Sequence, residues 1–268
     1  MEKYSTLKSS AVLAVFCGLS MLCYSQNDTR SPLPPILKNF VENVSLYLIF
    51  TKDTPGLQIG PDTLKIQKSD NFKTSDGRRG DACDLGKVTL KAPGLVDFSG
   101  SGTVILWVSP TNWSDKKDKE MPYILPFTAS NGQTTMLAGR QGETSKIYAH
   151  VILPEKKKVH LAFYGATRTW LDGSWHMLAV NWSPDSMGFS VDGSEFCSQS
   201  LNSPLPGGAA NTIAVGNNIG DSSLPNLKVD EFAVLNRKLT NGEVKKLYDD
   251  SPKATGAVPS SQDTEPDK

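Results

Sequence analysis

The chain is predicted to fold as an all-β sandwich of two antiparallel sheets with one short helix near its C-terminal end. Short apolar or alternating segments recur along residues 44–235 with Gly, Pro, Asn and Asp between them, a spacing typical of sandwiches and barrels. Residues 173–193 (GSWHMLAVNWSPDSMGFSVDG) hold two apolar runs around a Ser-Pro-Asp-Ser turn, which is a β-hairpin signal. Residues 240–243 begin the one marked helix.

The strands differ in how many of their faces are apolar. Residues 175–182 and 103–108 are apolar on both faces, which favours strands buried between layers, whereas 187–191 alternates as a strand with one wet face does. Residues 103–108 are expected to end as a strand at Ser109-Pro110, because proline cannot continue a central ladder. Residues 69–81 are expected to be turns. The other expected strands are 44–50, 57–59, 64–66, 87–90, 123–128, 134–137, 147–152, 159–164, 211–215 and 229–235.

The expected helix starts at a capping box. The Thr240 hydroxyl and the Glu243 carboxylate each satisfy a free backbone N–H of the first turn. Val244, Leu247 and Tyr248 then form a one-sided apolar stripe, which would pack this helix against a sheet.

Both ends of the chain differ in composition from the middle. Residues 1–25 are charged, then apolar, then small, which predicts a signal peptide and a secreted or extracytoplasmic protein, in the periplasm or at the cell surface. Lipidation at Cys23 is the alternative. Residues 26–40 are expected to be a Ser/Pro-rich linker, 41–250 one domain, and 251–268 a disordered tail.

Charge and cysteine usage narrow the function classes. The 28 basic residues balance the 28 acidic ones, so we expect no nucleic-acid partner. After signal removal no segment is apolar and long enough to span a membrane. Cys83 and Cys197 then remain, and they form either one disulfide or two separate buried thiols.

Enzyme signals are weak. Glycoside hydrolysis needs two carboxylates that converge on one bond, but Asp230 and Glu231 are adjacent and are expected on opposite faces of a strand. His176 is expected to be a packed, hydrogen-bonded strand residue. We therefore expect a non-catalytic binding domain, with a divergent glycosidase as the less favoured alternative.

Sugar binding commonly uses aromatic rings that are not needed in the core. Trp113 and Trp170 lie in the polar loop contexts TNWSDKK and TRTWLDG, where no strand pattern requires burial. We predict that these two residues bind a ligand, with Tyr164 as a weaker third. Local packing within the loops is the alternative.

Three stretches, 95–110, 173–193 and 229–248, resemble the early core strand, the central hairpin and the final strand with its terminal helix of one family. This family is the laminin-G-like jelly roll of the concanavalin A-like lectin/glucanase superfamily, in its secreted bacterial form. The N-terminal part departs most, because residues 48–53 read LIFTKD where the family often has an aromatic-rich strand ending in Phe-Asp-Glu.

The resemblance implies two curved sheets, frequently a bound calcium ion, and binding to glycans or proteins. Asp76, Asp81 and Asp84 form an acidic turn cluster to which Asp230 could add a ligand, since calcium prefers several oxygen ligands. Ordinary turn chemistry is the alternative. The expected partner is a carbohydrate or glycoprotein, and a protein-interaction or surface-scaffold module is the competing hypothesis.

Overall fold

The structure is a computed structural model that describes residues 37–52, 54–114, 123–217, 221 and 223–251. The chain divides into two units, residues 1–32 and 33–268, and all that follows concerns the second. The expected signal peptide, most of the expected linker and residues 252–268 of the expected tail lie outside the described residues. Within the described ranges, no helix combines the length and the apolar character that crossing a membrane requires.

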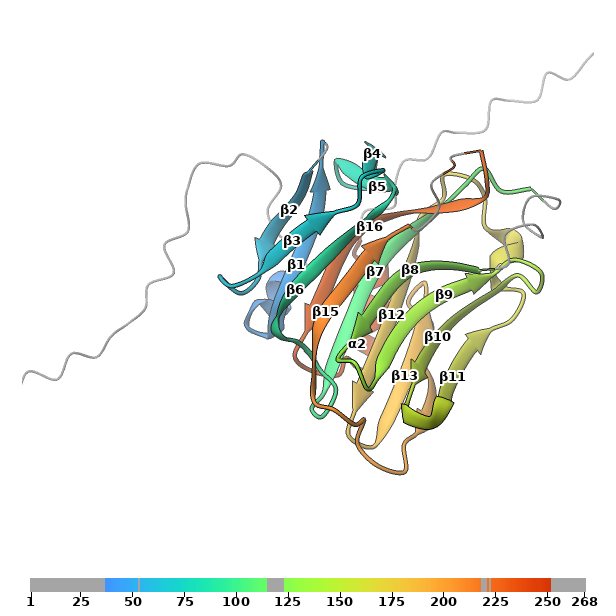
Figure 1. The fold of residues 1–268 in the computed structure, drawn as a ribbon. Helices are drawn as coiled ribbons and strands as arrows, with labels where there is room; N and C mark the ends of the chain where they lie inside the picture. The colour runs from blue at the N-terminus through green and yellow to red at the C-terminus, as the bar shows by residue number, and fades with distance from the viewer. Residues whose placement is uncertain (1–36, 53, 115–122, 218–220, 222, 252–268) are drawn as a thin grey trace, which may run out of the picture. The chain divides into compact units, whose positions relative to one another are not determined.

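Two antiparallel sheets form the fold, as predicted (Figure 1). The nine-stranded sheet has the order β14-β13-β12-β7-β16-β1-β5-β4, with β2 paired to β1, and the seven-stranded sheet has the order β11-β10-β9-β8-β15-β6-β3. The strands of the nine-stranded sheet are β1 (Val44–Thr51), β2 (Thr54–Ile59), β4 (Lys73–Asp76), β5 (Asp81–Leu85), β7 (Gly102–Thr111), β12 (His176–Ser183), β13 (Ser186–Val191), β14 (Cys197–Ser200) and β16 (Asn226–Leu235). Those of the seven-stranded sheet are β3 (Lys65–Lys68), β6 (Lys87–Asp97), β8 (Tyr123–Ser130), β9 (Thr135–Gln141), β10 (Lys146–Ile152), β11 (Lys158–Phe163) and β15 (Ala209–Gly216).

Strand β7 shows why some strands are apolar on both faces. Val104, Leu106 and Val108 belong to the main core cluster, which also contains the inner side chains of the seven-stranded sheet. Ile105 and Trp107 point the other way and join a second apolar cluster. The nine-stranded sheet is therefore covered on both sides, whereas the seven-stranded sheet is covered on one.

Helix α2 (Asn241–Asp249) closes the second cluster. Its capping box is confirmed, because Thr240 and Glu243 exchange side-chain and backbone hydrogen bonds. Arg237 lowers the pKa of the Glu243 carboxyl to about 2 through its hydrogen bonds. The Tyr248 ring stacks on Trp107 with a centroid distance of 5.9 Å. The short helix η1 (Leu37–Asn43) contributes Leu37 to the same cluster; two further short helices are η2 (Pro154–Lys156) and η3 (Ala166–Thr169).

One stretch expected to form turns is partly a hairpin. Strands β4 and β5 pair from Asp76↔Asp81 onward, and β5 also pairs with β16 at Val229↔Cys83. The β5 residues Ala82 and Cys83 are fully buried. Their burial stabilises a hairpin that the many Asp, Gly and Ser residues of this stretch did not indicate.

Candidate functional site

The side chains of the seven-stranded sheet that point away from the core form a face that we call the outward face. On β10, Ile147, Ala149 and Val151 enter the core, so Lys146, Tyr148, His150 and Ile152 lie on the outward side. Strand pairing places Lys146 beside Gln141, and Gln141 beside Tyr123. Tyr164 follows the pair Ile147↔Phe163 and so lies next to Lys146. We call Tyr164, Lys146, Gln141 and Tyr123 the tyrosine–lysine row.

The tyrosine–lysine row contains the exposed rings of the described chain. Tyr123 is 59% exposed and Tyr164 is 71% exposed, and no other aromatic residue among those described is a large exposed hydrophobic. The Lys146 Nζ atom is 5.4 Å from the centroid of the Tyr164 ring and 5.4 Å from that of Tyr148. Lys146 therefore lies between the exposed ring of Tyr164 and the buried ring of Tyr148.

Tyr148 lies beneath this surface instead of on it. It is 3% exposed, and burial, followed by the nearby Tyr123, raises the pKa of its hydroxyl to about 12. A Cβ atom placed on Gly139 would lie 2.6 Å from the Tyr148 Cζ atom. The absence of a side chain at Gly139 thus lets the Tyr148 ring lie flat against β9.

Two histidines of the outward face, His150 and His160, lie opposite each other on β10 and β11. The Nε2 atom of His150 contacts the Nδ1 atom of His160. Burial lowers the pKa of His150 to about 4, with His160, Lys158 and Lys146 adding to the effect. Burial and the same two lysines also lower the pKa of His160.

A second polar cluster is buried in the nine-stranded sheet. The register of β16 against β7 shifts between Asp230 and Ala233, and Glu231 has φ 47°. This bulge brings both carboxylates to the same turn, so the expectation of opposite faces is wrong. Asp230 accepts hydrogen bonds from the backbone N–H groups of Arg78, Arg79 and Glu231.

Glu231 completes the buried cluster. It accepts hydrogen bonds from Tyr47 Oη and from the guanidinium groups of Arg78 and Arg79. The Arg78 guanidinium lies 3.7 Å from the centroid of the Trp107 ring. Burial, and then the charge of Glu231, raise the pKa of Asp230 to about 7.

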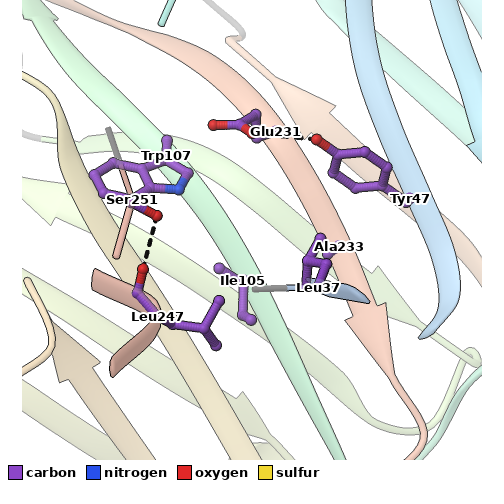
Figure 2. Close-up of a pocket in the computed structure, with 8 residues that line it drawn as sticks. All are labelled: Leu37, Tyr47, Ile105, Trp107, Glu231, Ala233, Leu247 and Ser251. Carbon is purple, nitrogen blue, oxygen red and sulfur yellow. Dashed lines mark hydrogen bonds between the residues drawn. The ribbon is translucent and has the colours of Figure 1, made fainter. Parts of the chain in front are cut away.

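Figure 2 shows the cavity beside this cluster. Glu231, Tyr47 and Trp107 line it together with apolar side chains near α2 and η1, and its volume is about 20 Å³. Such a volume holds about one water molecule. A sugar ring does not fit there, so the paired carboxylates serve to hold the β4–β5 turn onto β16.

The histidine titration predicts a pH-dependent stability. Because folding lowers the pKa of His150 from its ordinary value of 6.5 to about 4, the unfolded chain binds its proton first as the pH falls. Stability that is complete above pH 6.5 is therefore expected to decrease between pH 6.5 and pH 4. Urea unfolding across this range should show a smaller decrease for His150→Gln than for the wild type.

The test depends on the difference in pH-dependent stability between the wild type and His150→Gln, because other groups also titrate in this range. Asp230 has a raised pKa, so its own contribution runs in the opposite sense and decreases as the pH rises through the same range. Glu243, whose pKa is lowered, acts only below its ordinary value of 4.5. Identical slopes for wild type and His150→Gln would contradict the assignment to His150.

A wider hollow lies between the end of β13 and the start of α2. Its volume is about 460 Å³, and its walls come from the loop 192–195 together with Asn241, Gly242 and Lys245. No aromatic ring lines it, and its charges are mixed. The hollow therefore has fewer groups suited to binding a sugar than the outward face has.

His176 is hydrogen-bonded on both ring nitrogens, as the sequence predicts for a packed strand residue. Its Nδ1 atom is 2.7 Å from Asp192 Oδ2 and its Nε2 atom is 2.8 Å from Ser174 Oγ. This order of side chains is that of a serine hydrolase. However, Ser174 Oγ is only 2.5 Å from the Leu171 carbonyl oxygen, to which it donates, and it also accepts from the Leu171 N–H. The hydroxyl thus fastens a turn.

The two tryptophans predicted to bind a ligand are packed. Trp170 is 7% exposed and stacks on the His176 ring at 3.9 Å, while Trp113 stacks on Trp170 at 6.1 Å. The Arg140 guanidinium lies 4.0 Å from the Trp113 ring centroid, and Trp113 Nε1 donates to the Asn226 carbonyl. Trp170 is therefore buried and Trp113 is partly buried, because the loops fold onto the sandwich edge, so the local packing given as the alternative is what the structure shows for Trp170. Tyr164 stays a candidate.

Among the described residues, the four aspartates proposed for calcium do not come together as one cluster of ligands. Asp76 and Asp81 pair across a hairpin, Asp230 is committed to backbone N–H groups, and the Asp84 carbonyl accepts from two asparagine side chains. Over the described ranges, no group of three or more His, Cys, Asp or Glu side chains could hold a metal ion.

Of the two alternatives for Cys83 and Cys197, the structure shows two separate thiols and no disulfide, although only Cys83 is buried. Cys83 is buried on β5 and Cys197 is exposed on β14, and both are free. Even by the shortest path through the paired strands, these two strands are five steps or about 24 Å apart. A disulfide needs Cα atoms less than about 7 Å apart. Burial raises the pKa of the Cys83 thiol to about 12.

The sequence interpretation missed Tyr123, Lys146 and the histidine pair as site residues. The segment KIYAHVI (Lys146–Ile152) contains the signal, since its apolar residues at alternate positions mark one buried face. Polar and aromatic residues at the other positions then belong to the outward face. The loop tryptophans attracted attention because loops carry no such periodicity.

Comparison with known proteins identifies the family. Residues 85–245 match the family model described as the concanavalin A-like lectin/glucanases superfamily, and no curated protein sequence matches the chain. Similar solved structures are the receptor binding domain of botulinum neurotoxin D (TM-score 0.62, 15% identity, covering 78% of this chain and 52% of that one) and the binding domain of Paraclostridial Mosquitocidal Protein 1 (0.64, 12%, 77% and 52%).

A third similar structure is the ligand binding domain of botulinum neurotoxin serotype D in complex with N-acetylneuraminic acid (TM-score 0.63, 14% identity, covering 80% of this chain and 52% of that one). The chain thus spans about half the length of these binding domains, and at such identities the likeness is one of fold. The family model, in contrast, covers more than half of the 268 residues. The chain therefore belongs to the concanavalin A-like lectin/glucanase superfamily.

Proposed function

We propose that this protein is a secreted, non-catalytic, lectin-like binding domain that recognises carbohydrate or glycoconjugate through the outward face of its seven-stranded sheet. The observation that carries the proposal is that Tyr123 and Tyr164, the exposed aromatic rings of the described residues, lie in one row on that face. Aromatic rings contact the CH faces of sugars, and polar neighbours such as Gln141 and Lys146 bond their hydroxyls.

The geometry of the row suits an oligosaccharide. Tyr164 and Tyr123 follow or begin strands three steps apart in the order β11-β10-β9-β8, which is about 14 Å. Lys146 and Gln141 lie between them. A ligand of several sugar units can therefore contact both rings and the two polar side chains together.

The charges of this sheet favour binding over hydrolysis. On its seven strands Asp97 is the one carboxylate, and glycosidases use two carboxyl groups about 5 to 10 Å apart. Ring contacts instead need only exposed, rigidly held side chains. The family membership and the fold of the solved binding domains also support a binding role.

Glycan arrays followed by calorimetry test the proposal. Loss of one aromatic contact is expected to cost about 1 kcal/mol, so Tyr123→Ala or Tyr164→Ala should weaken binding by about 5- to 10-fold. The double variant should weaken it by about 30- to 100-fold. Leu171→Ala, which removes a side chain that is 73% exposed on another loop, is the control and should bind as the wild type does.

Two outcomes would count against the proposal. A folded wild-type protein that binds no glycan on the array would contradict it. So would a double variant that binds as tightly as Leu171→Ala. Binding to a protein partner that persists after enzymatic deglycosylation would favour the protein-interaction module instead.

A further inference from the structure

The outward face carries a second continuous row, six residues along β10 from the first. Strand pairing joins Lys158 to Ile152, Ile152 to Thr135 and Thr135 to Ser130. It then continues from Ser130 to Thr212, from Thr212 to Lys91 and from Lys91 to Lys65. This row crosses all seven strands, and we call it the lysine–hydroxyl row.

The lysine–hydroxyl row has positive charge at its ends and hydroxyl groups in its middle. Lys158, Lys91 and Lys65 are exposed, whereas the three hydroxyl residues between them are partly exposed. Thr135 Oγ1 donates to Ser130 Oγ at 3.1 Å. Lys158 and Lys91 lie on strands five steps apart, or about 24 Å.

The three lysines of this row form no ion pair within the described part of the chain. The single carboxylate on the seven strands, Asp97, is six residues beyond Lys91 on β6 and accepts hydrogen bonds from Ser99. Lys146 adds a further positive charge from the tyrosine–lysine row. The face is therefore basic although the whole chain has no net charge.

We infer that the ligand of the outward face is an acidic glycan, a linear oligosaccharide with sulfate or carboxylate groups spaced along it. Its anionic groups contact Lys158 at one end of the row and Lys91 with Lys65 at the other, and its hydroxyls bond Thr135, Ser130 and Thr212. A single sugar could not bridge ends about 24 Å apart. This inference rests on the proposed function and adds to it a second row of the same face, six residues along β10 from the tyrosine–lysine row, that binds the anionic part of the ligand.

Calorimetry with three matched octasaccharides tests the inference: a heparin-derived sulfated one, an oligogalacturonate with carboxylates, and neutral maltooctaose. The full-length protein should bind at least one acidic octasaccharide about 10-fold or more tightly than the neutral one. Raising NaCl from about 50 mM to about 250 mM should weaken that binding several-fold, because salt screens exposed charges. The sulfated and carboxylated ligands separate the two sources of negative charge.

Two triple variants with equal net charge locate the binding. Lys65→Gln/Lys91→Gln/Lys158→Gln should lower the affinity for the acidic ligand by about 10-fold or more. Lys73→Gln/Lys245→Gln/Lys246→Gln removes three lysines from β4 and α2. This variant should keep the affinity within about 2-fold, because β4 and α2 are not part of the seven-stranded sheet. Circular dichroism and thermal unfolding establish that both variants are folded.

Each other outcome has a defined meaning. Equal binding of neutral and acidic ligands, or equal losses in the two triple variants, would overturn the inference. The proposed function would stand in that case if Tyr123→Ala/Tyr164→Ala still weakens glycan binding by about 30-fold or more. Binding of acidic ligands that depends on the lysines but not on the two tyrosines would overturn the tyrosine–lysine row alone. Absence of any glycan binding would overturn both.

Discussion

Replacing Asp230 with alanine is expected to lower the free energy of unfolding by about 3–5 kcal/mol. The carboxylate oxygens accept three backbone N–H bonds, from Arg78 at 2.9 Å, Arg79 at 3.0 Å and Glu231 at 2.8 Å. Asp230 is fully buried, so water does not replace these bonds. The alanine variant leaves three donors unpaired whether or not the native carboxyl is ionised.

Asparagine at the same position should have a smaller effect. Its one carbonyl oxygen can accept from Arg78 and Arg79, but its amide group then faces the Glu231 N–H and that bond is lost. Urea unfolding should therefore rank wild type above Asp230→Asn and Asp230→Asn above Asp230→Ala. Asp62→Ala, at an exposed position, is the control and should unfold as the wild type does. An alanine variant as stable as this control would contradict the assigned role.

If Asp230 holds the β4–β5 turn, the stability lost in Asp230→Ala should be local to that turn. A general loss of packing would instead affect both sheets. Arg78 and Arg79 lie in the turn that joins β4 to β5, and Glu231 binds their side chains. Hydrogen exchange in Asp230→Ala should therefore increase first in β4 and β5. Exchange in β9 and β10, which belong to the other sheet, should change less.

The sequence predicted the sandwich because its signal is repeated. Residues 103–108 and 175–182 are apolar on both faces. The structure places 103–108 in β7 and 176–182 in β12, and these strands pair along seven consecutive residues. The capping box at Thr240 is equally local, since both of its hydrogen bonds join residues three apart. Features that depend on the repeat of apolar residues along a strand, or on contacts between residues close in sequence, could therefore be predicted.

The site residues depended on contacts between distant segments. Trp113 and Trp170 are 57 positions apart, yet they stack on each other, and no local pattern indicates that contact. The bulge at Glu231 likewise depends on Tyr47 and on the turn at Arg78. The choice between a disulfide and two separate thiols stayed open for the same reason, because cysteine count carries no information on strand order.

The outward face could be predicted in part, because it depends both on local sequence and on contacts between distant strands. The alternation within Lys146–Ile152 is local and indicates which side chains point outward. Which of them become neighbours depends on register, as in the pairing of Lys91 with Thr212 and Lys65. The rows could therefore be recognised only after all seven strands had been aligned.

Gly102→Ala is the second substitution with a large expected effect, about 3 kcal/mol of stability. A Cβ atom on Gly102 would lie 2.9 Å from the Trp182 Cε2 atom and still closer to Cζ2 and Cη2. Trp182 is 1% exposed, and its Nε1 atom donates to the Asp97 carbonyl at 2.8 Å. Because packing and this bond hold the ring, it cannot move away without cost.

A double-mutant cycle tests this steric cause. Trp182→Phe removes the ring atoms that the new methyl group would meet, together with the hydrogen bond to Asp97, and should itself cost about 2–3 kcal/mol. In the Trp182→Phe background, however, Gly102→Ala should cost less than about 1 kcal/mol, so the coupling energy should be about 2 kcal/mol. Additive losses would show that Gly102 is needed for its backbone, not for contact with the ring.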